Sequence, residues 1–140
     1  MRSARRRSRE LALQALYAWQ LSGASFEDLF AQLCESPGFD KADESYLRTL
    51  LSGVTREAQA IRPVLEQQLD RPWQELSPVE RGILLMAGYE LKFSPEIPYR
   101  VVINEAVEVA KVYGGTDGHK YVNGVLDRAA RTFRPDEASK

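Results

Sequence analysis

The chain has 140 residues, 44% of them hydrophobic and 28% charged, which is typical of one folded globular domain rather than a disordered chain. Its apolar runs are far shorter than the roughly 20 residues that span a bilayer, and its single cysteine excludes an internal disulfide. The net charge of −1 excludes a generally basic surface. We therefore expect a soluble, cytoplasmic protein of one domain over residues 1–140.

The charge is unevenly distributed, because residues 1–9 carry five arginines and no acid. Such a segment could be a solubilising tail, a targeting signal or a contact for a polyanion. The apolar stretch that follows contains Gln14 and Gln20 and has no small-residue cleavage pattern, which argues against a secretion signal. Glu10 argues against an organelle transit peptide. We predict a flexible basic arm over residues 1–8 and, at the other end of the chain, a frayed tail over residues 135–140.

Helical spacing of apolar residues begins at Leu11 and continues to Trp19, and Gly23 follows the last turn. Ser25, with an acid three residues later, predicts the start of a second helix that ends near residues 37–38. A third helix is predicted from about Asp43 to residue 61. Pro63 should break or kink it, because proline lacks the backbone donor and its ring clashes with the preceding turn. A short helix, PVLEQQL, is expected next.

The strongest helix-start signal is Ser77, with Pro78 at the first helical position and Glu80 at the third. The helix that follows is apolar on nearly every side, which places it at the centre of the fold. Two more helices are expected, VVINEAVEVAKVY and a last one from near Asp117 to Pro135. No stretch combines apolar alternation with hairpin turns. The sequence therefore predicts an all-α bundle of six or seven helices, possibly as two packed halves that meet near residues 70–77.

Catalytic and metal-binding patterns are missing from the sequence. His119 is the single histidine, and nothing in its spacing relative to Cys34 or a serine suggests a nucleophilic site. There is no phosphate loop, dinucleotide fingerprint or zinc pattern. We therefore expect no catalytic residues, no metal, no cofactor and no enzymatic activity.

Basic residues next to aromatic ones point instead to RNA. Tyr17 lies just after the arginines, off the buried stripe of its helix, and Lys120 is adjacent to Tyr121. Arginine and lysine neutralise phosphates, and aromatic faces stack on unpaired bases, which is the chemistry of single-stranded RNA recognition. Tyr17 could equally be a packing residue, Tyr121 is expected to be exposed or half-exposed, and the arginines could be a solvated tail.

The motifs RRRSRELALQALYAWQL, LLMAGYEL, NEAVEVAK and GHKYVNGVLDR together resemble the NusB transcription antitermination family over essentially the whole chain. The resemblance implies an all-helical protein that binds the single-stranded boxA element of nascent ribosomal RNA. It also implies NusE, a small-subunit ribosomal protein, as a partner, and other Nus factors and RNA polymerase as indirect ones. In that family such a complex suppresses premature Rho-dependent termination.

The resemblance also implies a set of site residues. The RNA-binding residues would be Arg5, Arg6, Arg7, Tyr17, Asp117, Lys120 and Tyr121. The partner face would include Glu80 and the short helix before it, where Gln68 replaces a possible aromatic residue. Glu80 and Asp117 also have structural alternatives, since each could cap a helix.

Two other interpretations remain open. A similar helical domain forms the N-terminal part of some RNA cytosine methyltransferases, which continue into a cofactor-binding domain; we expect this chain, which ends at Lys140, to lack that catalytic half. The chain could also be a protein-interaction module whose arginines only confer solubility, or a homodimer that hides its RNA face.

Overall fold

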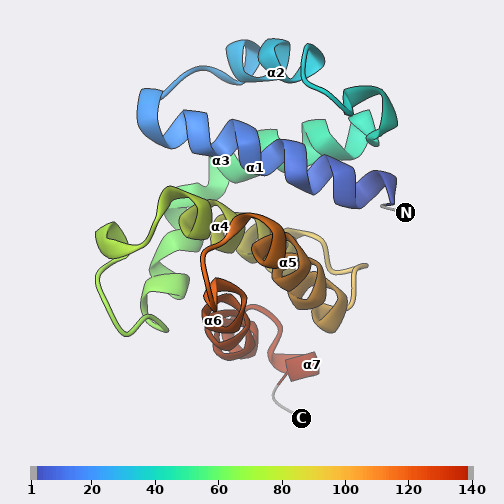
Figure 1. Cartoon of the computed structure of the whole chain (residues 1–140). Coiled ribbons are helices and arrows are strands. Elements are labelled where there is room, and N and C mark those ends of the chain that lie inside the picture. The colour runs from blue at the N-terminus through green and yellow to red at the C-terminus, as the bar shows by residue number, and fades with distance from the viewer. Residues whose placement is uncertain (1–2, 139–140) are drawn as a thin grey trace. The chain divides into compact units, whose positions relative to one another are not determined.

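The computed structural model describes residues 3–138, and every regular element in that range is helical. The α-helices are α1 (Ala4–Ser22), α2 (Phe26–Cys34), α3 (Glu44–Glu66), α4 (Pro78–Phe93), α5 (Tyr99–Tyr113), α6 (Gly118–Phe133) and α7 (Pro135–Ala138), and short 3₁₀ turns lie at η1 (Phe39–Lys41) and η2 (Trp73–Glu75) (Figure 1). The predicted all-α class is confirmed. No helix within residues 3–138 is both long enough and apolar enough to cross a membrane.

The chain divides into two compact units, Met1–Arg56 and Glu57–Lys140. The division falls inside α3, upstream of the segment 70–77 that the sequence suggested. In the first unit α1 packs against α2 and η1. Gly23 ends α1 in the left-handed conformation, with φ of 68°, and its N–H donates to the Trp19 carbonyl at 2.8 Å. This is the role that its position in the sequence predicts.

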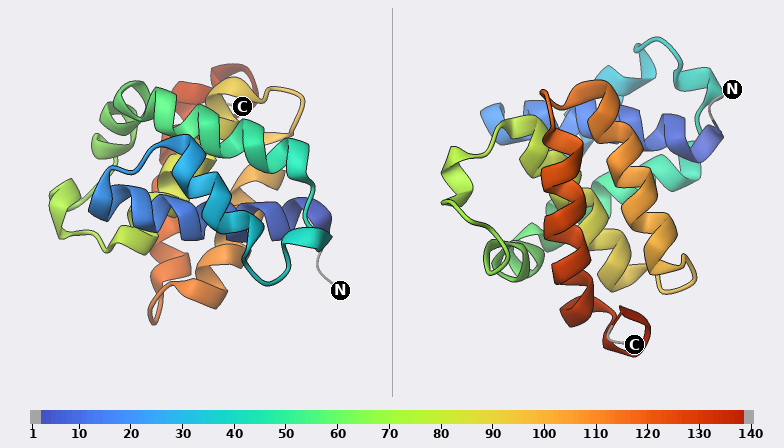
Figure 2. Two further views of the ribbon diagram at one scale, coloured as in Figure 1. Left: turned by 90° about the horizontal axis from the view of Figure 1, so that it is seen from above. Right: turned by 60° about the horizontal axis from the view of Figure 1, so that its bottom comes forward.

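In the second unit α4, α5 and α6 pack against one another, and α7 packs on α6. Figure 2 shows α5 and α6 side by side. Ser77 and Glu80 form the predicted capping box at the start of α4. The middle of α4 is buried continuously from residue 82 to 91, as its apolar sequence predicts.

The prediction that Pro63 breaks the third helix is wrong, because α3 continues through it to Glu66. Ile61 and Leu65 lie one turn apart on either side of Pro63, and both are completely buried. Burial of these two side chains favours the helix by more than the lost hydrogen bond disfavours it. The separate short helix expected after Pro63 therefore does not exist.

The polar tail is more ordered than predicted as far as Ala138; residues 139–140 lie outside the described part of the chain. Arg134, only 7% exposed, directs its guanidinium at the end of α4, where it donates to the carbonyls of Glu90, Leu91 and Ser94. It also pairs with Glu137 at 2.7 Å, and Glu137 accepts a hydrogen bond from the backbone N–H of Tyr99 at the start of α5. The tail thus joins the ends of three helices.

Candidate nucleic-acid interface

The arginines at the N-terminus lie on a fixed helix rather than on a flexible arm. Ser3 caps α1 by accepting a hydrogen bond from the N–H of Arg6 at 3.1 Å. The buried Ser8 hydroxyl lies 2.8 Å from the carbonyl of Asp43 and accepts from the N–H of the same residue at 3.0 Å. The start of α1 is therefore bonded to the residue before α3. The prediction of a flexible arm is wrong from Ala4 onward; residues 1–2 lie outside the described part.

Arg5 and Arg7 of the predicted RNA-binding set contact side chains of the first unit. The Arg5 guanidinium lies over the Tyr46 ring, 4.3 Å from its centroid. The Arg7 guanidinium lies 3.8 Å from the Glu10 carboxylate. Arg5 is exposed, whereas Arg6 and Arg7 are half-buried, so all three remain partly accessible. Cation–π packing limits the directions in which Arg5 can point.

Tyr17 lies further along α1 and is 44% exposed. Its position off the buried stripe predicts this exposure. An exposed aromatic ring of this kind can stack on a base. The first unit therefore presents three arginines and the exposed Tyr17 ring on a single helix.

In the second unit, Asp117 occupies the N-cap position of α6, but its side chain does not cap the helix. Its backbone is left-handed, with φ of 62°, and its side chain makes no capping hydrogen bond. The carboxylate pairs instead with the ammonium of Lys120 at 3.3 Å, and both side chains are about 70% exposed (67% and 73%). The alternative in which the Asp117 side chain caps α6 is therefore wrong; only its backbone carbonyl accepts from the first turn of the helix.

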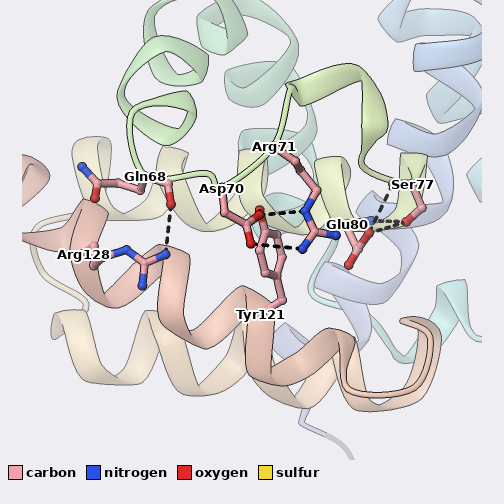
Figure 3. Close-up of polar contacts among 7 residues, drawn as sticks. All are labelled: Gln68, Asp70, Arg71, Ser77, Glu80, Tyr121 and Arg128. Atoms are coloured by element: carbon pink, nitrogen blue, oxygen red, sulfur yellow. Dashed lines mark hydrogen bonds and ion pairs between the residues drawn. The ribbon is translucent and has the colours of Figure 1, made fainter.

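Tyr121 is half-buried on α6 and is held by two residues that sequence reasoning missed (Figure 3). Its hydroxyl donates to a carboxylate oxygen of Asp70 at 3.1 Å. The Arg71 guanidinium lies over its ring, 4.6 Å from the centroid. Arg71 also donates twice to Asp70, from Nε at 2.7 Å and from Nη2 at 3.2 Å. No sequence signal marks this arrangement, because Asp70 and Tyr121 are 51 positions apart.

The electrostatics of this cluster follow from its hydrogen bonds. The Arg71 guanidinium lowers the pKa of Asp70, with a further contribution from the Tyr121 hydroxyl. Burial, followed by the hydrogen bond to Asp70, raises the pKa of Tyr121. At neutral pH the cluster therefore contains a carboxylate, a guanidinium and a neutral phenol.

The predicted partner-binding residues lie near the same cluster. One carboxylate oxygen of Glu80 accepts from the N–H of Ser77 at 3.2 Å, which completes the capping box. Gln68 is half-buried in the turn after α3, not on a separate helix, and its carbonyl accepts from Arg128 of α6 at 2.9 Å. Within residues 3–138 no group of three or more acids, histidines or cysteines could hold a metal ion.

Residues 6–131 of the chain match the NusB family. The chain belongs to the NusB family. It is 57% identical to the transcription antitermination protein NusB of Paraburkholderia phytofirmans over 98% of this chain and 95% of the relative. The resemblance to the NusB family that the sequence motifs indicated is therefore confirmed, and with it the assignment as a transcription antitermination protein.

Solved NusB structures share the fold. NusB of T. maritima is 31% identical, with a TM-score of 0.81 and coverage of 99% of both chains. A chain from the structure of the antitermination factors NusB and NusE in complex with dsRNA is 26% identical, with a TM-score of 0.77 and coverage of 91% of this chain and 96% of that chain. Family membership and fold therefore agree.

In this NusB-family chain the predicted RNA-binding residues fall into two groups. Arg5, Arg6, Arg7 and Tyr17 belong to α1 of the first unit. Asp117, Lys120 and Tyr121 belong to the start of α6 in the second unit. The convergence of the two groups on one groove stays a prediction.

Proposed function

We propose that this NusB-family protein acts in the cytoplasm as a non-catalytic antitermination factor that binds the single-stranded boxA element of nascent ribosomal RNA together with NusE. The observation that carries the proposal is the similarity, over 91% of this chain, to a protein solved with NusE and dsRNA. The accessible arginines of α1 and the Lys120–Tyr121 pair supply the phosphate-binding and base-stacking groups that such a ligand needs.

The ordered start of α1 changes the expected energetics of binding. A flexible arm loses conformational entropy when it binds RNA, whereas arginines on a preformed helix lose only side-chain freedom. If about four phosphates are neutralised, the logarithm of the binding constant should fall with the logarithm of salt concentration with a slope of about −3 for single-stranded RNA.

The experiment is an anisotropy titration of labelled boxA RNA against the protein carrying Arg5→Ala, Arg6→Ala and Arg7→Ala together. Binding should fall by at least about tenfold and the salt slope should flatten, because about three phosphate contacts are lost. Arg48→Ala, Arg62→Ala and Arg131→Ala, combined in one control protein, remove the same charge elsewhere. Equal losses in the two proteins, or equal affinity of the wild type for scrambled RNA, would contradict the proposal. Circular dichroism checks that both proteins are folded.

The partner role of Glu80 can be separated from its role in the capping box. Glu80→Gln keeps a side chain that serves in capping boxes but removes the charge. We expect weaker NusE binding with a free energy of unfolding within about 0.5 kcal/mol of the wild type. Calorimetry with purified NusE measures the first quantity and urea unfolding the second. Unchanged NusE affinity would assign Glu80 to the helix cap alone.

NusE should also raise the RNA affinity, because it adds a second RNA-contacting surface at high effective concentration. Measuring boxA affinity with and without NusE tests this part of the proposal. Equal affinities would mean that the two proteins bind RNA independently.

A further inference from the structure

Arg71 contacts Tyr121 but is not one of the residues predicted to bind RNA. It lies in the segment between α3 and η2, and its guanidinium covers the ring of Tyr121 while donating two hydrogen bonds to Asp70 (Figure 3). The side chains of Asp70 and Arg71 are 66% and 46% exposed. A ligand arriving at Tyr121 therefore meets an accessible guanidinium that is already oriented.

A phosphate can replace the Asp70 carboxylate as the group to which Arg71 donates its hydrogen bonds. Ion pairs exposed to solvent contribute little net stability, so replacing one partner is easy. The two parallel hydrogen bonds of a guanidinium fit a phosphate as well as a carboxylate. A backbone phosphate can therefore take the position of the Asp70 carboxylate while Arg71 stays stacked on the ring.

We propose that Arg71 is a further RNA-binding residue of this chain, which binds a backbone phosphate of single-stranded RNA above the Tyr121 ring and is held ready by Asp70 when RNA is absent. The inference rests on the proposed function, because it requires that Tyr121 lies on the RNA face. Under this proposal Asp70 has two effects. It positions the guanidinium in the free protein, and its negative charge competes with the phosphate for Arg71.

Asp70 is the main source of negative charge around Arg71. The hydrogen bond and charge of Asp70, with a smaller contribution from the charge of Glu80, raise the pKa of Arg71. The guanidinium therefore lies in a negative environment, and its two hydrogen bonds to Asp70 orient it. The same environment repels a phosphate, so removing the charge of Asp70 should strengthen RNA binding rather than weaken it.

The test compares five variants in anisotropy titrations of single-stranded boxA RNA at several salt concentrations. Arg71→Ala should weaken binding about fivefold to tenfold and reduce the magnitude of the salt slope by about 0.7, the value for one phosphate contact on a single strand. Arg71→Lys should keep the slope but bind less tightly than wild type, because an ammonium is not bidentate. Asp70→Asn should bind about twofold to fivefold more tightly.

Arg62→Ala is the matched control, since Arg62 also pairs with a carboxylate, that of Glu66, and also lies over an aromatic ring, that of Trp73. It removes the same charge and the same types of contact and should leave affinity and slope unchanged. If Arg71→Ala behaves like Arg62→Ala, the inference is overturned. Asparagine keeps a side-chain oxygen that accepts a hydrogen bond from Arg71, so Asp70→Asn removes the competing charge and retains the positioning contact. Weaker binding by Asp70→Asn would therefore also overturn the inference.

Lys120→Ala distinguishes failure of this inference from failure of the proposed function. If Lys120→Ala weakens binding and Arg71→Ala does not, the RNA face stands and Arg71 is not part of it. If neither substitution matters, the start of α6 is not an RNA site, and both proposals fail for this unit. Urea unfolding of each variant shows whether a loss of affinity comes from a loss of folding.

Discussion

Replacing Asp117 by asparagine should tighten RNA binding without weakening the fold. Asp117 has a left-handed backbone, with φ of 62°, which asparagine adopts more readily than most residues. Its side chain caps nothing, and its ion pair with Lys120 is exposed on both sides. Exposed pairs contribute about 0–1 kcal/mol. We therefore expect the free energy of unfolding to change by less than about 0.5 kcal/mol.

The gain in RNA affinity has two sources. A carboxylate about 6 Å from a phosphate in water is repelled by about 0.7 kcal/mol, so removing the charge gives about a threefold gain. Lys120 also loses its ion pair with Asp117 and becomes available to a phosphate. This second effect makes the free energy of RNA binding more favourable by at most a similar amount. The expected result is boxA binding tighter by about threefold to tenfold. The gain should shrink at high salt, because exposed charges are screened.

The assay is an anisotropy titration at low and at high salt, with Asp136→Asn as the control. Asp136 is exposed on α7, so this control removes one negative charge from another part of the same unit. The reasoning would be refuted by weaker binding of Asp117→Asn, or by an equal gain in the control. The first result would mean that the carboxylate contacts RNA productively, and the second that only net charge matters.

Three further predictions concern the second unit. Arg134→Met should lower the free energy of unfolding in urea by about 3–5 kcal/mol, because two buried carbonyls lose a charged donor. The exposed control Arg131→Met should cost less than about 0.5 kcal/mol. Gly88→Ala should cost about 1–3 kcal/mol by the same measurement, because a Cβ there would lie 2.5 Å from a methyl of the fully buried Ile61. Hydrogen bonds from Arg134 and the backbone of Tyr99 lower the pKa of Glu137. The stabilisation by the Glu137 carboxylate should therefore be present above the usual glutamate pKa and be lost as the pH falls through the lowered pKa. The check is the urea midpoint of unfolding measured against pH, whose decrease at acid pH should be smaller in Glu137→Gln.

Local signals in the sequence predicted most helix positions correctly. Ser77 and Glu80 mark the start of α4 through a capping box that spans four adjacent residues, and Gly23 marks the end of α1. Tyr17 is exposed, as the apolar stripe of its helix indicates. These features depend on neighbours within one or two helical turns, which a single sequence shows directly.

Most of the errors involve partners that are distant in the sequence, and one involves a local backbone angle. The arginine-rich start looked flexible because its binding partners, Asp43 and Tyr46, come more than 30 positions later. Pro63 looked like a helix end because the burial of Leu65 is a tertiary effect. Asp117 looked like a cap because residue type alone does not reveal a positive φ. The role of Asp70 and Arg71 was missed because their partner, Tyr121, is about 50 positions later in the sequence.

The hydrogen bonds of Ser8 to Asp43 have a consequence for how the arginine cluster can evolve. They fix the register of α1, and successive residues of an α-helix point about 100° apart around its axis. Arg5, Arg6 and Arg7 therefore radiate in three different directions. Moving one arginine by a single position would turn it away from its present target even though the composition stayed the same. Natural variation in this segment should consequently preserve the order of its residues more strictly than their number.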